Sequence, residues 1–457
     1  MPIRTRVIAT AALAAVTALA LSGCVGAGVA AESTGDAGAT ATIPTLGPDQ
    51  KVSITFESYN LAQAGAWTDT IQGLIKTFES QHPNITVTGQ APTAAAGANT
   101  SYISSVQTEM LAGKAPDVAQ LTFDGLDYIA NDLGAQPISK LVGEKAVEDA
   151  FGGEYPMNAN ATKLGDWNGV TYGIPYVFST PVLWYNATAL AKAGVTNPDF
   201  STWDGLQKVA AQVKAKTGTP PVTISCTVTG GDWCMQGIIK SNGGKIVSAD
   251  HKTIEFGDSG SVGAVQEMRK LNDAGLLQNL DSTSMYTAFA AGKSLIQVQT
   301  SALQSAFMAG AKAGGWELKN TTLPAFGDKT VAPTNSGSAL FIMSKDPAKQ
   351  AAAWEFIKFM TSPTAYEQIS TKIGYLPLRD TMTEGSGPLA EWAKSNPLVA
   401  PNIAQLKKLQ PWESYPGSNY SQISTIFSKA VEDSIYYGKD PKTTMQDAQK
   451  QAQALVK

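Results

Sequence analysis

The stretch from Tyr172 to Asn186 carries small hydroxyl side chains on a locally rigid backbone. Pro175 and Pro181 flank a short segment that contains Ser179 and Thr180. Each proline fixes its own φ and pushes the preceding residue toward extended geometry. Hydroxyls held in fixed directions are suited to hydrogen bonding with a ligand. We expect this segment to cross between two lobes and to present the two hydroxyls to a ligand in the cleft. The alternative is an ordinary loop that leads into a buried strand.

The sequence contains few of the residue patterns that are typical of catalytic sites. Its two histidines are His82, which precedes a helix-breaking proline, and His251, which lies in a polar turn. Neither belongs to a Ser/His/Asp order or a metal-type cluster, and no Gly-rich phosphate loop precedes a Lys-Ser/Thr pair. We therefore predict no catalytic residue, no metal and no cofactor. A pair of carboxylates could still hydrolyse a glycosidic bond, so a secreted glycoside-active enzyme remains the alternative.

The elements that must position a site begin with an alternation of strands and helices. The patterns predict strands at 52–56, 85–88 and 117–122, with helices at 67–78 and 102–111 between them. This order implies parallel strands with right-handed crossovers, and ligands bind beyond the carboxyl ends of such strands. Tyr59, Asn60 and Asp124 follow two of these ends and are candidates. Asp124 could instead cap a helix or be a solvated loop charge.

A second α/β pattern follows the proline-flanked segment. It includes an expected helix from Trp203 to Lys216, a strand at 222–225, a helix start at Thr300-Ser301 and a small polar stretch at 334–338. At 457 residues the chain is too long for one small core, and two or more domains or lobes are expected.

The first residues predict export and a lipid anchor. Arg4 and Arg6 precede an apolar run from Val7 to Leu21, which is too short for a comfortable membrane span. Leu21-Ser-Gly-Cys24 looks like a bacterial lipobox, in which Cys24 is acylated; the alternative is a plain signal peptide. We expect residues 1–23 to be the lipoprotein signal peptide. Residues 24–50, rich in Gly, Ala, Ser and Thr, should form a flexible tether at the extracytoplasmic face of the membrane.

The remaining cysteines, Cys226 and Cys234, predict a disulfide. An even number of cysteines in an exported chain favours pairing, although two free thiols remain the alternative. The closed loop is small, so we expect it to shape the Gly230-Gly-Asp-Trp233 tip rather than to stabilise the whole fold.

Composition excludes several classes of protein. The hydrophobic fraction is 43% and the charged fraction 16%, which is typical of a globular chain. The net charge is −4, and the sequence contains no Lys/Arg cluster. Because phosphate neutralisation needs a basic face, we expect no nucleic-acid partner.

Several motifs occur in an order that resembles a known family. They are the lipobox at Cys24, Ala112-Gly-Lys-Ala-Pro-Asp117, Tyr172-Gly-Ile-Pro175 before Val182-Leu-Trp-Tyr-Asn186, Phe289-Ala-Ala-Gly-Lys293, and Gly374-Tyr-Leu-Pro377. Together they resemble the extracellular solute-binding proteins of carbohydrate ABC importers. Ser179–Asn186 and Gly374–Leu378 most resemble the glycerol-3-phosphate and glycerophosphodiester binders, in a family that also includes maltodextrin binders.

The resemblance implies a fold of two α/β lobes with the ligand in the cleft, a type II-like periplasmic-binding-protein fold. It implies three crossings between the lobes, near Pro175–Leu183, Gln297–Ser301 and Asn335–Ile342. The expected N-lobe is 51–177 plus 301–335, and the expected C-lobe is 178–300 plus 336–457.

The resemblance also implies the ligand contacts. By position they are Asp124, Ser179, Thr180, Trp233, Thr300, Ser301, Gly337 and Tyr375, with Tyr59, Asn60 and Tyr415 added as candidates from their place in the chain. Asp124 is expected to accept sugar hydroxyls and Tyr375 to stack on a sugar face, although Tyr375 could instead pack on the core.

One departure from the family bears on the ligand. The stretch Trp412–Tyr420 contains no Lys or Arg, whereas the glycerol-3-phosphate binder carries an arginine there. A dianion would want such a charge, so a neutral sugar or polyol is favoured. We predict a monomeric, non-catalytic receptor that delivers a small carbohydrate to ABC permease subunits by hinge closure. The alternative ligand is a glycerophosphodiester or another polyol derivative.

Overall fold

The computed structural model describes residues 42–93 and 102–456. The predicted signal peptide, the lipidation site Cys24 and most of the predicted tether lie outside the described residues.

The first lobe is built on a mixed sheet of five strands in the order β2-β1-β3-β11-β6. The strands are β1 Val52–Glu57, β2 Ile85–Gln90, β3 Val118–Thr122, β6 Gly173–Ser179 and β11 Ser336–Ile342. β1 pairs in parallel with β2 and β3, and β11 runs antiparallel to β3 and β6. The predicted parallel start of the chain is thus confirmed.

The second lobe is built on a sheet of four strands in the order β10-β7-β9-β8. They are β7 Pro181–Asn186, β8 Val222–Ile224, β9 Ile296–Thr300 and β10 Leu318–Thr321. Thr180 is the single residue between β6 of the first sheet and β7 of the second. The proline-flanked segment therefore crosses between lobes, and the two-lobe fold class is confirmed.

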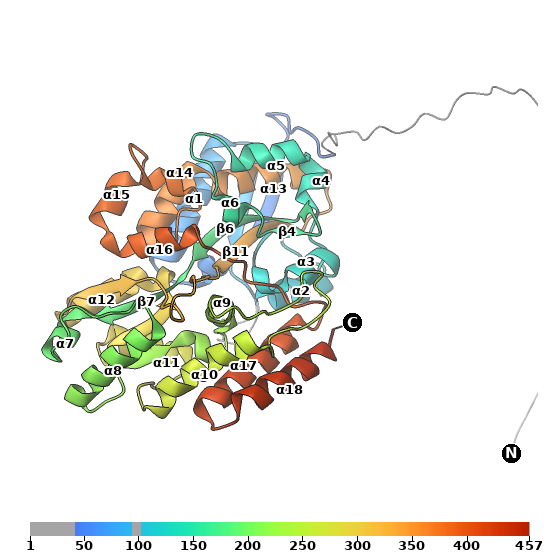
Figure 1. The fold of residues 1–457 in the computed structure, drawn as a ribbon. Helices are drawn as coiled ribbons and strands as arrows, with labels where there is room; N and C mark the ends of the chain where they lie inside the picture. Colours follow the sequence, from blue (N-terminus) through green and yellow to red (C-terminus); the bar gives the residue numbers. More distant parts are fainter. Residues whose placement is uncertain (1–41, 94–101, 457) are drawn as a thin grey trace, which may run out of the picture. The chain divides into compact units, whose positions relative to one another are not determined.

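Helices surround both sheets (Figure 1). Those of the first half and of the first sheet are α1 Ala66–Gln81, α2 Tyr102–Leu111, α3 Leu126–Asn131, α4 Ile138–Val142, α5 Glu144–Phe151, α6 Ala159–Thr162, α13 Pro347–Met360 and α14 Pro363–Gln368. Those near the second sheet are α7 Ala187–Lys192, α8 Trp203–Thr217, α9 Asp232–Ser241, α10 Ser259–Asp273, α11 Ser282–Ala290, α12 Gln304–Gly314, α17 Tyr420–Tyr436 and α18 Pro441–Gln453. The helices α15 Ala390–Ser395 and α16 Ala400–Leu406 lie between these groups in sequence.

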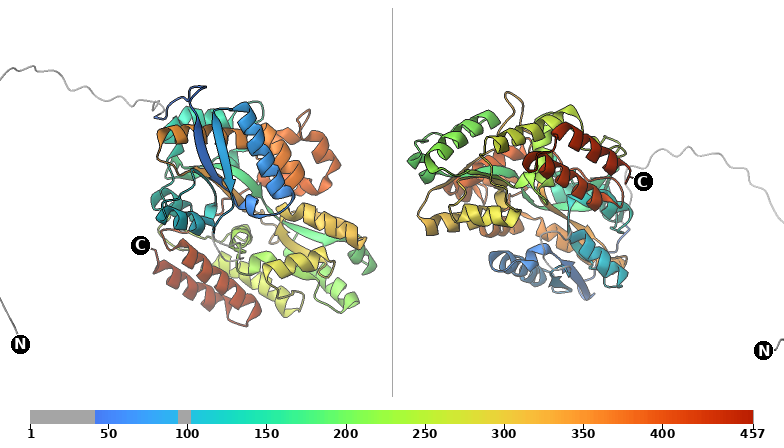
Figure 2. Two further views of the ribbon diagram at one scale, coloured as in Figure 1. Left: turned by 180° about the vertical axis from the view of Figure 1, so that it is seen from behind. Right: turned by 90° about the horizontal axis from the view of Figure 1, so that it is seen from below.

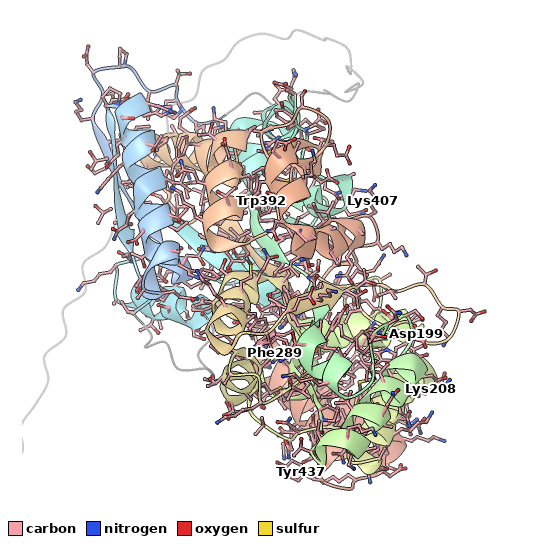
Figure 3. The ribbon with its side chains drawn as sticks, turned by 90° about the vertical axis from the view of Figure 1, so that its left-hand side faces the viewer. Asp199, Lys208, Phe289, Trp392, Lys407 and Tyr437 are labelled. Carbon is pink, nitrogen blue, oxygen red and sulfur yellow. A yellow bond between two sulfur atoms is a disulfide. The ribbon has the colours of Figure 1, made fainter. Side chains whose placement is uncertain are left out.

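The last helices of the chain return to the second lobe. α17 packs on α10 and on α18, and both views of Figure 2 show α17 and α18 beside α10. In Figure 3, Trp392 on α15 lies with the orange helices in the upper half, whereas Asp199, Lys208 and Tyr437 lie in the lower half.

The expected division of the second half of the chain between the lobes is wrong for two strands. β10, inside the predicted N-lobe segment 301–335, pairs with β7 of the second sheet. β11, inside the predicted C-lobe segment 336–457, pairs with β3 and β6 of the first sheet. Strand patterns alone do not show which sheet a strand joins, because periodicity indicates which side chains are buried and not which strand is the partner.

The crossings differ accordingly. The first crossing is at Thr180, as expected. The chain returns to the first sheet through the segment between β10 and β11, and this segment ends at Asn335, where the expected third crossing begins. The predicted crossing at Gln297–Ser301 is not one, because α12 and β10 follow β9 within the second lobe. Instead, the chain turns back into the second lobe at Thr300 and Ser301, and these residues hydrogen-bond to Ser179 and Thr180.

The end of the predicted tether is ordered against the first lobe. The backbone N–H groups of Thr42 and Ile43 both donate to the carbonyl of Leu141, and the side chains of Ile43 and Leu46 pack on the core. The prediction of a free tether therefore does not hold for 42–50, because these few apolar groups find a groove to fill.

Within the described ranges, no helix is both long enough and apolar enough to cross a membrane.

A buried arginine joins distant parts of the first lobe. Arg379 is 4% exposed, and its guanidinium donates to the carbonyls of Thr361, Gly152, Tyr155 and Ala150 at 2.5 to 2.9 Å. Ala150 lies at the carboxyl end of α5, where helix carbonyls lack an intrahelical partner and the helix dipole is negative. Arg379 therefore supplies the donors that this helix end needs.

Replacing Arg379 should be costly. Arg379→Met leaves several buried carbonyls without donors, and we expect a loss of about 3 kcal/mol or more in the free energy of unfolding. Urea denaturation followed by circular dichroism measures it. Lys145→Met, which removes an exposed ion pair with Asp149, is the control and should leave the transition almost unchanged. Equal stability of the two variants would contradict this role of Arg379.

Candidate functional site

The predicted hydroxyls at the crossing bond to the protein itself. The hydroxyl of Thr300 donates to Ser179 Oγ at 2.6 Å, and the backbone N–H of Thr180 donates to Ser301 Oγ at 3.2 Å. Thr300 also caps the short helix that follows it. The structure thus brings Ser179, Thr180, Thr300 and Ser301 together, as a joint between β6–β7 and the end of β9.

Thr180 is the most enclosed member of this joint. It is fully buried, its hydroxyl donates to Asn402 Oδ1 at 3.0 Å, and it accepts from Gln405 Nε2 at 2.9 Å. Asn402 and Gln405 come from α16, which sequence reasoning did not connect with the crossing. A ligand that used the Thr180 hydroxyl would have to displace these amides.

Tyr59, Asn60 and Tyr375 form a second group at the carboxyl end of β1. The Tyr375 hydroxyl donates to Asn60 Oδ1 at 3.4 Å, and the Tyr59 hydroxyl donates to Ser338 Oγ at 3.1 Å. Tyr375 is 5% exposed, and its ring meets the edge of Trp67 with centroids 5.1 Å apart. The packed alternative for Tyr375 is therefore the one the structure shows. Asn60 Nδ2 is buried and has no hydrogen-bond partner among the described residues.

The polar stretch Thr334–Ser338 runs through the site and connects its groups. The Thr334 hydroxyl donates to the carbonyl of Trp233, and Asn335 Oδ1 accepts from the backbone N–H of Trp412 at 2.9 Å. Ser338 accepts from Tyr59, as described above. Gly337 pairs with Phe178 at φ 117°, and a Cβ there would lie 1.8 Å from the carbonyl oxygen of Val177. Close strand approach therefore requires glycine at 337.

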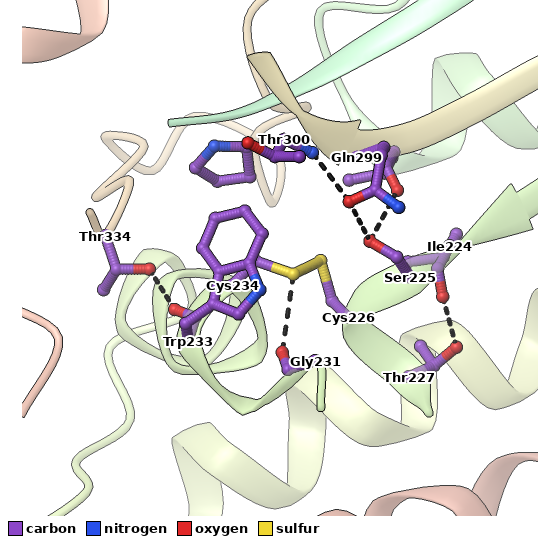
Figure 4. Close-up of a disulfide and its surroundings, with 12 residues drawn as sticks. Ile224, Ser225, Cys226, Thr227, Gly231, Trp233, Cys234, Gln299, Thr300 and Thr334 are labelled. Carbon is purple, nitrogen blue, oxygen red and sulfur yellow. Dashed lines mark hydrogen bonds between the residues drawn. A yellow bond between two sulfur atoms is a disulfide. The ribbon is translucent and has the colours of Figure 1, made fainter. Parts of the chain in front are cut away.

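The predicted disulfide between Cys226 and Cys234 is present and anchors the first turn of α9. It joins the short 3-10 helix at Ser225–Thr227 to α9 across a Cα–Cα distance of 5.1 Å. Trp233 lies between Asp232 and Cys234 and is 9% exposed. In Figure 4 its indole lies beside the disulfide and points toward Thr300. The disulfide thus fixes a tryptophan next to the joint.

Asp124 and Asp232 bring acidic groups from the two lobes close enough for the charge of one to act on the other. Asp124 follows β3 in the first lobe and accepts from the Thr122 hydroxyl at 2.6 Å. Asp232, 6% exposed, begins α9 in the second lobe. Its Oδ2 accepts from the Ser424 hydroxyl at 3.2 Å and from Trp412 Nε1 at 3.4 Å.

Burial raises the pKa of both carboxyls, and repulsion adds to the rise for Asp232. Burial raises the pKa of Asp232 to about 7, and the negative charge of Asp124 adds to the rise. Burial also raises the pKa of Asp124, while its bond from Thr122 acts in the opposite direction. Burial first, and then the charge of Asp232, hold the pKa of the buried Tyr415 well above its usual range. Hydroxyl groups of a ligand would satisfy these acceptors without adding negative charge.

A second acidic pair lies at the end of β1. Gln90 Nε2 donates to Glu57 Oε2 at 3.1 Å and to Glu109 Oε2 at 3.3 Å, so one amide bridges two carboxyls. Burial, followed by the effect of Glu109, raises the pKa of Glu57 to about 8. Glu57 therefore keeps its proton at neutral pH and can donate as well as accept.

The sequence patterns did not single out Asp232, Glu57, Asn402 or Gln405 as site residues. Two of them carried a usable signal: Glu57 ends the first strand beside Tyr59, and Asp232 directly precedes Trp233. The α16 amides carried none, because only tertiary packing brings residues 402 and 405 to position 180.

The raised pKa of Glu57 predicts how stability depends on pH. Below pH 4.5 the folded and unfolded chains both hold the proton, whereas between 4.5 and about 8 only the folded chain does. The contribution of Glu57 to stability is thus complete below pH 4.5 and is lost as pH rises toward 8. We expect the stability of the wild type relative to Glu57→Gln to fall across this range in urea denaturation.

Glu144→Gln, at an exposed position, is the matched control and should show no such trend. A pH-independent difference between the wild type and Glu57→Gln would sink the assignment.

Comparison with known proteins places these features in context. A family model described as bacterial extracellular solute-binding protein matches residues 64–367. An uncharacterised ABC transporter extracellular-binding protein of Pyrococcus horikoshii is 29% identical over 182 residues. That match spans 39% of this chain and 39% of the relative, so it covers well under half of that protein.

Two solved structures share the fold over most of the chain. The cyclic α-maltosyl-1,6-maltose binding protein of Arthrobacter globiformis superposes with a TM-score of 0.74 at 20% identity, covering 88% of this chain and 98% of the other. UgpB of Mycobacterium tuberculosis, in complex with glycerophosphocholine, superposes with a TM-score of 0.75 at 20% identity and the same coverage.

Proposed function

The chain belongs to the family of bacterial extracellular solute-binding proteins, and we propose that it captures a small carbohydrate between its lobes for an ABC importer. The observation that carries the choice of ligand is the pairing of Asp124 and Asp232 from opposite lobes beside Trp412 and Tyr415. Carboxylates accept sugar hydroxyls, and aromatic rings cover the apolar C–H face of a sugar. Asn60 Nδ2, buried and unpaired among the described residues, adds a donor.

The similarity in fold to the cyclic α-maltosyl-1,6-maltose binding protein supports a carbohydrate ligand. The two carboxyl groups of Asp124 and Asp232 also favour a ligand without negative charge. A phosphodiester would approach Asp124 and Asp232, both of which repel an anion when ionised. Lys240, which reaches the 411–415 segment, is paired with Glu413 at 2.7 Å and also donates to the carbonyl of Pro411 at 2.6 Å. Its charge is therefore already compensated.

A glycerophosphodiester or other polyol derivative remains the second candidate ligand, favoured by the likeness to UgpB bound to glycerophosphocholine. Glycerol hydroxyls would suit the same carboxylates, but the phosphate would need a cation from elsewhere in the cleft.

The receptor is proposed to act as a monomer that is anchored through Cys24 and released from its signal peptide at that residue. The lipobox-like Leu21-Ser-Gly-Cys24 supports this. Closure of the lobes about the Thr180 joint would present the loaded receptor to the permease subunits. The disulfide fits an oxidising, extracytoplasmic location.

Removing one carboxylate tests the site. Asp124→Ala should weaken sugar binding at least about tenfold, which corresponds to about 1.4 kcal/mol, because a buried acceptor is lost. Isothermal titration calorimetry measures it, using the sugar that most raises the melting temperature in a screen. Asp328→Ala, at an exposed loop position, is the control. Unchanged affinity of Asp124→Ala would remove this residue from the site.

The same titration tests the alternative of a glycoside-active enzyme. We expect stoichiometric binding and recovery of intact oligosaccharide after prolonged incubation, since a receptor releases what it binds. Chromatographic detection of hydrolysis products by purified protein would overturn the receptor function.

A further inference from the structure

A cavity of about 450 Å³ lies between the lobes, beside the Asp124–Asp232 pair. Its lining comes from the first lobe near Phe123 and Trp167, from the second lobe near His251, and from the connecting segment that contains Trp412. None of the predicted ligand contacts lines it. Its volume is within the range typical of small-molecule sites, roughly 300 to 1,000 Å³.

The first-lobe wall is a rigid hairpin. β4 Asp166–Trp167 and β5 Val170–Thr171 pair through an Asn168-Gly169 turn, with φ of 49° and 75°. Such Asn-Gly turns match the twist of a tight hairpin, so the position of Trp167 is well fixed. The Thr171 hydroxyl donates to Asp166 Oδ1 at 2.6 Å and orients that half-buried carboxylate at the cavity.

The second-lobe wall is a turn that presents His251. Ser248 holds this turn by donating to Asp250 Oδ1 at 2.6 Å and accepting from the backbone N–H of Thr253 at 2.9 Å. His251 has φ 53°, which is uncommon for a residue other than glycine. Its ring lies against Trp167 with centroids 4.9 Å apart.

These two walls retain hydrogen-bonding capacity. Trp167 Nε1 and His251 Nδ1 are buried and have no partner within the described ranges. Trp167 as a whole is 9% exposed. Buried donors and acceptors are normally paired, so unpaired atoms on two facing walls point to a polar ligand.

Trp412 connects this cavity to the proposed sugar site. Its backbone N–H is held by Asn335, its Nε1 donates to Asp232, and its side chain also lines the cavity. The two places therefore adjoin across one indole.

We propose that this cavity is a second sugar-ring position, so that the ligand spans at least two rings, one at Asp124–Asp232 and the next between Trp167 and Trp412. The assignment rests on the proposed function. The tryptophans cover the ring's C–H faces, while Asp166 and the free nitrogens of Trp167 and His251 bond its hydroxyls. Because Trp167 and His251 come from different lobes, the second ring would also stabilise the closed form.

Chain-length dependence of binding tests the second position. The probes are glucose, maltose and maltotriose; xylose, xylobiose and xylotriose; arabinose, arabinobiose and arabinotriose; and glycerophosphocholine. In the series that binds, we expect affinity to rise about tenfold or more from one ring to two, equivalent to about 1.4 kcal/mol. Trp167→Ala should abolish this gain and leave the monosaccharide affinity within about twofold, because only the second ring contacts the indole.

Two further variants separate binding from folding. Trp167→Phe keeps a ring but lacks the N–H, and should retain part of the gain even if Trp167→Ala proves unstable. Trp392→Ala, in α15 and outside the cavity lining, is the matched control and should keep the full gain.

The binding results distinguish the second ring position from the carbohydrate function itself. Equal affinity for monosaccharide and disaccharide would overturn the second position. So would an equal loss of monosaccharide and disaccharide affinity in the Trp167 variants. Neither result would contradict the proposed sugar receptor. Binding of glycerophosphocholine alone overturns the second position and favours the alternative ligand. Binding of no probe overturns the carbohydrate function itself.

Discussion

The buried polar joint at Thr180 is the constraint on which the rest of the structure depends. One residue separates the two sheets, and its backbone and hydroxyl bond to Ser301, Asn402 and Gln405. These partners come from two other passes of the chain, Ser301 from the end of β9 and the two amides from α16, so the joint fixes where those passes meet. Unpaired polar groups at such depth would cost about 1–3 kcal/mol each, which keeps the arrangement specific. The joint lies where β6 ends, β7 begins and the chain turns at the end of β9.

Electrostatics then limits what the cleft can hold. Asp124 and Asp232 approach each other from opposite lobes, and Glu57 and Glu109 share one amide donor at the end of β1. Buried carboxyls without cations resist ionisation, as the raised pKa values of Glu57 and Asp232 indicate. In the proposed function, these carboxyls would favour hydroxyl donors over anions. In that function, a bound polyol that donates to both lobes would offset the repulsion between Asp124 and Asp232.

Much of the local structure followed from short-range patterns. The β1, β2 and β3 strands and the helices between them were predicted from their periodicity, and the disulfide was predicted from the number of cysteines. The site was predicted less completely. Tyr59, Asn60 and Asp124 follow strand ends, where topology places ligands, but Thr180 was read as a ligand contact and is enclosed by α16 amides. Tyr375 was predicted either to stack on a sugar face or to pack on the core, and its ring packs against Trp67.

The sequence by itself determined which segments form strands and helices, that the chain crosses between lobes at residues 175–183, and that a mildly acidic chain carries carboxylates and aromatics suited to polyols. These properties depend on neighbours within a few residues, where periodicity and proline geometry act. The tertiary structure decided that β10 joins the second sheet and β11 the first, that Asn402 and Gln405 reach Thr180, and that Trp167 meets His251. Those contacts join residues tens to hundreds of positions apart. Their partners are selected by packing and by the pairing of buried polar groups, which a local sequence pattern does not specify.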